Sequence, residues 1–560
     1  MIRRLRILSQ TLFSLVFLYL LARTQYGGTD TLGLPVKVFL EVDPFHFLTT
    51  LLASGTVQGL LWLALITVGL SVVLGRFFCG WVCPMGVTIQ LVQKLPFRRR
   101  QSVIESNHWR PSQKIKFYLL GALLVASVFG LQWSGIFDPL SLIIRSMGLI
   151  VLPAIELGVR GVFDAAYRHN PLGISGVTEL IFNWLQGRAI SFTQPHFQQS
   201  FLIGLVFLVI LVLSFIRHRF WCRVLCPLGA LLGTIARFGL FRIRQADGCS
   251  GCARCTFNCQ GAAEPEVADG WRPSECLVCG NCTAACSGAL SMGFDRPRWR
   301  LPRRTADRAA GRPTPRRAST PVAAATAVPA PTPVVAFAGV DIRRRHFLLA
   351  SAAGLAAVPM MRLGMPPGRV NPALIRPPGA RAEPEFLGLC VRCAECMKVC
   401  LTHGLQPTLL EAGLEGMWTP RLVPRIGYCE YNCTLCGQVC PTQAIRRLPL
   451  EVKRKVRIGL AAIDTSRCLP YAFQTNCIVC EEHCPLPRKA IWFEEQEVVT
   501  RTGERKRVKQ PHVAIDLCTG CGICETKCAV QDLPAIRITS ANEDRNPDNR
   551  VLLERAGGGL

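Results

Sequence analysis

Cysteine is the residue type that carries most chemistry in this chain, with 28 cysteines among 560 residues. Two segments read C-x2-C-x2-C-x3-C. This spacing is typical of two-cluster ferredoxins, in which each [4Fe–4S] cluster takes three cysteines of one motif and the fourth of the other. Zinc sites also use C-x2-C pairs, but the doubled four-cysteine pattern favours iron and sulfur. The predicted ligand sets are Cys249, Cys252, Cys255 with Cys286, and Cys276, Cys279, Cys282 with Cys259.

Four further motifs of four cysteines lie nearer the C-terminus. The outer two have ferredoxin spacing, the second opens with C-x3-C, and the third opens with C-x8-C. With the first two motifs they predict six [4Fe–4S] clusters, or about 24 iron atoms per chain. The four motifs are Cys390, Cys393, Cys396 and Cys400; Cys429, Cys433, Cys436 and Cys440; Cys468, Cys477, Cys480 and Cys484; and Cys518, Cys521, Cys524 and Cys528.

The remaining cysteines form two related Cys-x-x-x-Cys-Pro motifs, RFFCGWVCPMG from Arg76 and RFWCRVLCPLG from Arg219. A spacing of four places both thiols of a pair on one side of a helix. Four thiolates suit one more iron–sulfur cluster or a zinc ion. Thiols held apart for packing, or two redox-active dithiols, are the alternatives. The four residues are Cys79, Cys83, Cys222 and Cys226, and they leave no cysteine for a disulfide.

Four apolar blocks that approach the length of membrane spans, about 20 residues, surround these motifs. Lysine and arginine concentrate before the first block, between the second and third, and after the fourth, as the positive-inside rule requires. We therefore expect a membrane domain whose N-terminus and residues from 217 onward face the cytoplasm. This distribution of the +27 net charge argues against a nucleic-acid partner. The blocks are Ile7–Ala22, Val57–Gly75, Phe117–Ile136 and Phe201–Ile216.

The membrane part contains an internal repeat. An Asp-Pro segment follows the first block as DPFHFL, at Asp43, and the third block as DPLSLI, at Asp138. Each half therefore reads span, Asp-Pro, span, Cys-x-x-x-Cys-Pro, which suggests a pseudo-two-fold axis along the membrane normal. Asp before Pro is a good helix N-cap, but a carboxylate at membrane depth is also a functional candidate. Both readings remain open for the two aspartates.

An export-type signal lies inside the chain. DIRRRHFLLASAAGLAAVP, from Asp341, has paired arginines followed by a short apolar run, as a twin-arginine signal does. An ordinary fifth span is the alternative. Iron–sulfur domains fold around their clusters, so a C-terminal domain that is exported must cross the membrane already folded, which is what the twin-arginine route allows. We expect an uncleaved anchor with the following domain in the periplasm.

These patterns predict an α-helical membrane domain with four spans in two repeats, followed by ferredoxin-like domains. The boundaries are residues 1–240 for the membrane domain, 241–295 for a cytoplasmic two-cluster domain and 296–340 for an Arg/Pro/Ala-rich linker. An anchor helix over 341–362 then leads to a four-cluster α+β ferredoxin-like domain over 363–560. The expected location is the bacterial inner membrane, with clusters on both faces.

The order of motifs resembles a fusion of two known proteins. Residues 1–290 resemble the NapH-type membrane iron–sulfur subunit, and residues 341–540 resemble its exported partner of the NapG/MauM type. The resemblance implies oxidation of quinol from the membrane pool and delivery of electrons toward a periplasmic reductase or cytochrome. It also implies a pairing among the C-terminal motifs: Cys390, Cys393, Cys396 with Cys528; Cys518, Cys521, Cys524 with Cys400; Cys429, Cys433, Cys436 with Cys484; and Cys468, Cys477, Cys480 with Cys440.

Two other functions fit the same motifs. The chain could be a non-catalytic accessory protein that matures or reactivates a periplasmic metalloenzyme, or a conduit from a cytoplasmic donor without quinone. If quinol is the donor, Asp43 and Asp138 are the candidate proton acceptors. The sequence shows neither a c-type haem motif nor a dinucleotide-binding motif, so the clusters must carry the redox chemistry.

Overall fold

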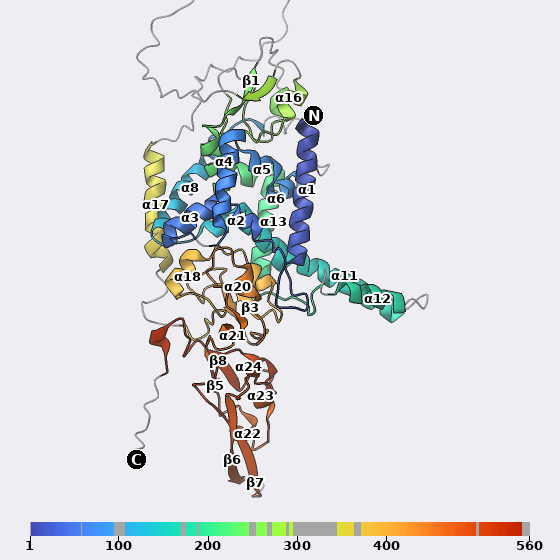
Figure 1. Cartoon of the computed structure of the whole chain (residues 1–560), viewed down its shortest axis with the longest axis vertical. Coiled ribbons are helices and arrows are strands. Elements are labelled where there is room, and N and C mark those ends of the chain that lie inside the picture. The colour runs from blue at the N-terminus through green and yellow to red at the C-terminus, as the bar shows by residue number, and fades with distance from the viewer. Residues whose placement is uncertain are drawn as a thin grey trace, which may run out of the picture.

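The computed structural model describes residues 2–57, 59–94, 107–169, 175–186, 190–245, 254–265, 271–286, 290–294, 344–362, 371–499 and 503–551. Over these residues the molecule is elongated (Figure 1). A helical bundle occupies its middle, a small domain with β1 and α16 lies at one end, and the C-terminal domain lies at the other. The predicted linker, residues 296–340, lies outside the described residues, as do Cys249 and Cys252.

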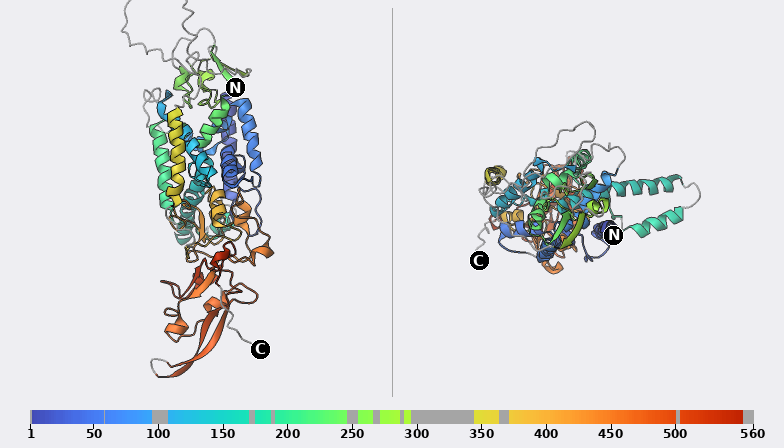
Figure 2. Two further views of the ribbon diagram at one scale, coloured as in Figure 1. Left: turned by 90° about the vertical axis from the view of Figure 1, so that its left-hand side faces the viewer. Right: turned by 90° about the horizontal axis from the view of Figure 1, so that it is seen from above.

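The bundle is built from helices of very different length. Its first half contains α1 (Ile2–Arg23), α2 (Val38–Glu41), α3 (Pro44–Ser54), η1 (Leu61–Leu63), α4 (Ala64–Leu74), α5 (Phe77–Trp81) and α6 (Pro84–Val92). Its second half contains η2 (Pro111–Lys114), α8 (Ile115–Val128), α9 (Ser134–Phe137), α10 (Pro139–Ser146), the π-helical turn η3 (Met147–Val151), α13 (Ser200–Ile216), the π-helical turn η4 (Trp221–Leu225) and α14 (Pro227–Ala236). Between η3 and α13, the helices α11 (Leu152–His169) and α12 (Ser175–Leu185) form a hairpin that projects sideways from the bundle (Figures 1 and 2).

The bundle is apolar outside and partly polar inside. Leu8 of α1 is 66% exposed and Phe201 of α13 is 82% exposed, whereas Arg76, Lys116 and Arg145 are at most 2% exposed. Buried charged side chains and large exposed apolar side chains both depart from the usual distribution in soluble proteins. Two helices of the described chain, Ile2–Arg23 and Pro139–Arg168, are long and apolar enough to cross a membrane.

The predicted spans are only partly matched by helices of spanning length. The first lies within α1, but the helices at the other three blocks have 11, 14 and 17 residues. Local chemistry explains the shortening. The second block loses its start, because Gly59, with φ +61°, precedes the helical residues. The third block loses its end, because Gly130, with φ +81°, follows α8. At the fourth block α13 covers the whole predicted segment. The Pro139–Arg168 helix was not expected as a span. The four-span layout therefore stays a prediction.

Helix α17 (Arg344–Arg362), where the export-type signal was identified, packs lengthwise on α8. Tyr118 contacts His346, Gly121 lies against Phe347, and Arg362 donates to the Phe129 carbonyl, so the two helices run in the same direction. Gly354 permits this contact, because a Cβ there would overlap the Ala122 carbonyl oxygen. Helix α17 thus begins near the end of the bundle that carries the small domain and ends near the C-terminal domain (Figure 2).

The two cysteine-rich domains contain short elements around their motifs. The small domain pairs β1 (Phe241–Gln245) with β2 (Leu290–Phe294) and contains α15 (Arg254–Phe257) and α16 (Asn281–Ala285). The helices of the C-terminal domain are α18 (Glu383–Leu389), α19 (Glu395–Lys398), α20 (Leu435–Val439), α21 (Leu450–Lys453), α22 (Leu469–Ala472), α23 (Val479–Glu482), α24 (Ile523–Lys527) and η6 (Pro547–Asn549). Its antiparallel pairs are β3 (Leu405–Pro407) with β4 (Pro420–Leu422), β5 (Leu460–Ile463) with β8 (Ile536–Thr539), and β6 (Ile491–Val499) with β7 (Arg505–Val513).

Candidate metal centres

The sixteen C-terminal cysteines gather into four groups, each with three members of one motif and the last member of a neighbouring motif. Three of these groups line separate hollows, and the members of each group interact electrostatically with one another. We name them by their distance from the bundle. Set I is Cys390, Cys393, Cys396 and Cys440; set II is Cys429, Cys433, Cys436 and Cys400; set III is Cys518, Cys521, Cys524 and Cys484; and set IV is Cys468, Cys477, Cys480 and Cys528.

This arrangement corrects the pairing that the family resemblance implied. The first motif exchanges its fourth cysteine with the second, and the third with the fourth, so Cys528 and Cys400 do not join the outer motifs. The physical reason is local packing: α19 packs on α20 and α23 packs on α24, so motifs that are adjacent in sequence meet. Closing a short loop also costs less entropy than closing the loop between the outer motifs.

The four sets follow one another along the long axis of the domain. Set I adjoins the bundle, because Cys393 and Val391 belong to the bundle's own hydrophobic core. Sets II and III meet where the Cys429 backbone N–H donates to the Cys521 carbonyl at 2.8 Å. Set IV lies beyond, near α22 and α23, at the end remote from the bundle (Figure 1). The arrangement suits stepwise electron transfer from one cluster to the next.

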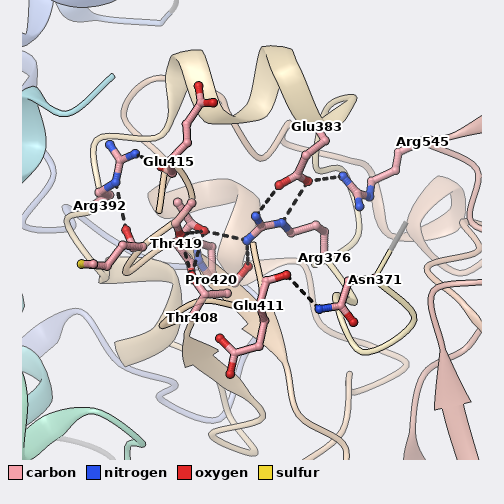
Figure 3. Close-up of polar contacts among 12 residues, drawn as sticks. Asn371, Arg376, Glu383, Arg392, Thr408, Glu411, Glu415, Thr419, Pro420 and Arg545 are labelled. Carbon is pink, nitrogen blue, oxygen red and sulfur yellow. Dashed lines mark hydrogen bonds and ion pairs between the residues drawn. The ribbon is translucent and has the colours of Figure 1, made fainter. Parts of the chain in front are cut away.

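A charged network fixes the segment that covers set I (Figure 3). Arg376, fully buried, donates to Glu383 at 2.5 Å and to the Pro420 carbonyl at 2.7 Å. Arg545 donates to the same carboxylate at 2.6 Å. Burial alone would raise the pKa of Glu383, but the two guanidiniums lower it to about 2. Residues 376 and 383 are thereby tied to the C-terminal end of the domain.

The small domain has the cysteine grouping expected for its second cluster. Cys282 interacts electrostatically with Cys276, Cys279 and Cys259. Cys255 and Cys286 pack in one small cluster of buried residues, as the other predicted set requires. Burial raises the pKa of Cys276 to about 12, so this thiol would stay protonated at neutral pH without a metal. The Ala263 N–H donates to Cys259 Sγ at 3.2 Å, a bond that fits a cluster-bound sulfur.

The Cys-x-x-x-Cys-Pro motifs of the two halves meet inside the bundle, and we call their four thiols the axial cysteine set. Cys83 interacts with Cys79 and Cys222, and Cys226 interacts with Cys222 and Cys79. We had expected both cysteines of a pair on one helix, but each pair is split between two elements. Cys83 and Cys226 are the N-caps of α6 and α14. The proline after each cysteine starts the new helix. Four neighbouring thiols, three of them buried and that of Cys79 half-buried, fit a cluster or a tetrahedral metal.

The axial cysteine set touches the small domain directly. Trp81 Nε1 donates to the Val278 carbonyl at 3.1 Å, and Gly80 packs closely on Leu277. Beside them, Lys116 Nζ bonds Glu275 Oε2 at 2.5 Å inside the interface. Cys276 and Cys279 flank Leu277 and Val278 in the sequence. The small domain's second cluster set is therefore the neighbour of the axial cysteine set.

Asp43 and Asp138 are N-caps that also converge. Asp43 Oδ1 accepts from the Phe45 N–H, and Asp138 Oδ2 accepts from Leu140 and Ser141, all at 2.8 Å. Both side chains are fully buried. Between them lies His46, whose Nε2 is 3.2 Å from Asp138 Oδ2 and 4.0 Å from Asp43 Oδ2. Our sequence reasoning missed His46; the available signal was its place three residues after Asp43 in the repeat.

A hollow that is partly open to solvent lies between the bundle and the C-terminal domain. Its walls include Leu152 and Ile155 of α11, and Phe197 before α13. Its polar lining includes Glu156, Lys398 and His403, and Lys398 stands between two cluster ligands, Cys396 and Cys400. His403 Nε2 contacts the Thr193 carbonyl at 3.2 Å, while its Nδ1 has no hydrogen-bond partner. Apolar walls with a few polar groups are typical of small-molecule sites.

Comparisons with known proteins support the iron–sulfur assignment. The family described as "4Fe-4S binding domain" matches residues 56–103 and 199–245, which contain the axial cysteine set. The ferredoxin-type protein NapG of Escherichia coli (strain K12) is 38% identical over 201 residues, 35% of this chain and 84% of the relative.

Two further relatives extend this result. The methylamine utilization ferredoxin-type protein MauM of Methylorubrum extorquens is 36% identical over 187 residues, 32% of this chain and 80% of the relative. The putative electron transport protein YccM of Escherichia coli (strain K12) is 27% identical over 228 residues, 40% of this chain and 52% of the relative. No solved structure matches the chain. The extent of the NapG and MauM matches shows that the chain belongs to the NapG/MauM family of ferredoxin-type iron–sulfur proteins.

Proposed function

We propose that the chain is a quinol-oxidising, membrane-bound electron-transfer protein that passes electrons through its clusters to a periplasmic reductase or cytochrome. The observation that carries the proposal is the succession of cysteine sets along the long axis of the molecule. The small domain adjoins the axial cysteine set within the bundle, and set I adjoins the bundle's other end. Sets II, III and IV continue outward from it.

The donor site that we favour is the hollow beside Lys398. A quinol ring fits against its apolar walls, and Lys398 and His403 can bond its oxygens. Oxidation of one quinol releases two electrons and two protons, and sets I and II, whose ligands flank Lys398, can each take one electron. Asp43 and Asp138 are less suitable for direct contact, because neither carboxylate has accessible surface.

Reduction of the purified oxidised chain by menadiol tests this function. We expect rapid loss of the visible absorbance of the clusters. Leu152→Trp, which fills the hollow, should slow this reduction about tenfold or more and leave reduction by dithionite unchanged. Leu157→Trp is the matched control, since Leu157 is 61% exposed on the same helix and is not among the lining residues. Equal rates in all three proteins would exclude the hollow, and no reduction of the unaltered chain would exclude quinol as donor.

Topology is part of the proposal. A reporter fused after Gly293 should report cytoplasm and one after Leu560 should report periplasm. Replacing Arg344 and Arg345 with lysine should leave the C-terminal domain in the cytoplasm, because the twin-arginine route reads the arginine pair. The blot should show a single full-length band, as an uncleaved anchor requires. If both reporters indicated the same side of the membrane, the proposed topology would be wrong.

A quinone-independent conduit is the second candidate. It is favoured by the contact between the small domain and the axial cysteine set, because a cytoplasmic donor could enter there. Under this alternative a reduced cytoplasmic-type ferredoxin should reduce all clusters while menadiol reduces none. Cys79→Ser should then block reduction of sets I to IV but not of the small domain's clusters.

A further inference from the structure

The two Asp-Pro segments meet so that equivalent residues of the two halves face one another. Asp43 corresponds to Asp138 in the repeat, and His46 corresponds to Ser141. His46 Nε2 and Ser141 Oγ are 2.8 Å apart. Both four-residue segments therefore offer a carboxylate to a metal. They differ at the fourth position, where one half has an imidazole and the other a hydroxyl. Like the axial cysteine set, this meeting point draws on equivalent positions of both halves.

The meeting point has free ligand atoms. Capping occupies Asp43 Oδ1 and Asp138 Oδ2, and Asp138 Oδ2 also lies 3.2 Å from His46 Nε2. Asp43 Oδ2, Asp138 Oδ1 and His46 Nδ1 have no hydrogen-bond partner. One carboxylate oxygen from each aspartate and one His46 nitrogen lie within 4.8 Å of one another. All three side chains are fully buried. An unpaired buried polar atom is costly, and two buried carboxylates need compensating positive charge.

Among the described residues, neither aspartate forms an ion pair with a lysine or arginine; a protonated His46 is the one cation that could contact them. Arg145 interacts electrostatically with Asp138, but it donates to the carbonyls of Gly135 and Arg392 and stacks on Trp418. A dication bound to two carboxylates and one neutral imidazole would be locally neutral. Imidazole and carboxylate ligands together suit iron(II), zinc and manganese.

We propose that Asp43, His46 and Asp138 bind a divalent transition-metal ion, with Ser141 as a hydrogen-bond partner or fourth ligand. The site lies between the axial cysteine set and set I: Asp138 interacts electrostatically with Cys83, and Arg145 interacts with both Asp138 and Cys393. The ion would be separate from the clusters and would join the two halves of the bundle. This proposal does not depend on quinol being the donor.

Metal and acid-labile sulfide, measured together on the full chain purified without oxygen, test the site. Each [4Fe–4S] cluster contributes equal iron and sulfide, so any iron above sulfide, or any zinc or manganese, counts the further ion. We expect about one further ion per chain after dialysis against a chelator. If the unaltered chain contains none, the proposal is wrong.

Variants then assign the ion to these residues. Asp43→Asn and Asp138→Asn keep a capping oxygen, and His46→Ser copies the residue that the other half already has. Each should lose the further ion while sulfide stays unchanged, which also shows that the protein has folded. Asp164→Asn, on the exposed face of α11, is the matched control and should retain the ion. Retention of the ion in all three site variants would contradict the assignment.

Discussion

The bundle and the C-terminal domain use duplicated motifs in opposite ways. In the bundle the two halves converge, so that Cys79, Cys83, Cys222 and Cys226 form a single set. In the C-terminal domain two neighbouring motifs exchange one cysteine, so that each pair of motifs makes two sets. Duplication in the bundle therefore builds one site on an axis, whereas duplication in the C-terminal domain lengthens a row of sites.

The largest expected effect concerns which motif supplies the fourth cysteine of each set in the C-terminal domain. Cys440→Ala and Cys390→Ala should each remove the set I cluster, about four of some 24 irons, and abolish the same paramagnetic resonance signal of the reduced protein. Cys528→Ala should remove a different signal, that of set IV. The pairing would be refuted if Cys390→Ala and Cys528→Ala removed the same signal and Cys440→Ala another.

The bundle should respond to cysteine replacement as a single site. Since the axial cysteine set draws on both halves, Cys79→Ser and Cys222→Ser should abolish one common signal, although the residues are far apart in sequence. Iron per chain should fall equally in both variants. Loss of different signals, or of none, would show that the two pairs act as separate dithiols or as packing residues. The iron and sulfide of the other clusters provide the internal control.

These cases also show what the sequence can and cannot predict. The type of ligand at each motif follows from spacing, because three cysteines of a motif wrap one cluster locally. The cluster that the fourth cysteine of a motif binds does not follow from spacing, because the packing of α19 on α20 places Cys400 and Cys440. Similarly, DPFH predicts that Asp43 caps a helix, but only packing between the halves brings Asp138 to His46. The lengths of the helices at the second and third blocks were overestimated because hydropathy does not register Gly59 and Gly130, whose positive φ values interrupt those blocks.

A second difference lies in what holds each region together. The C-terminal domain uses a buried charge network at Glu383 (Figure 3). We expect Glu383→Gln to destabilise this domain by about 2 kcal/mol at neutral pH, because it leaves buried Arg376 without its counter-charge. The change should appear as a lower urea midpoint for cluster loss. Asp548→Asn, at an exposed position, is the control.

The pH dependence of this contribution has a definite sign. The pKa of Glu383 is depressed from 4.5 to about 2 in the folded state. Its stabilisation is therefore complete above about pH 4.5 and is lost as the pH falls toward 2. The difference between the unaltered chain and Glu383→Gln should stay constant from neutral pH down to about pH 5 and shrink below that. A difference that already shrinks between pH 7 and 6 would point to another group.

The smallest expected effect tests the packing of the bundle. At Gly354 a Cβ would overlap the Ala122 carbonyl oxygen, so Gly354→Ala must push α17 away from α8. We expect a loss of about 1 kcal/mol, since alanine's better helix propensity offsets part of the overlap. Gly158→Ala is the matched control, because Gly158 is also helical and a Cβ there meets nothing within 4 Å. It should be neutral or slightly stabilising. Thermal loss of helical circular dichroism in detergent measures both. If Gly354→Ala were as harmless as Gly158→Ala, α17 would be only loosely attached, and close contact with α8 could not be what anchors the C-terminal domain to the bundle.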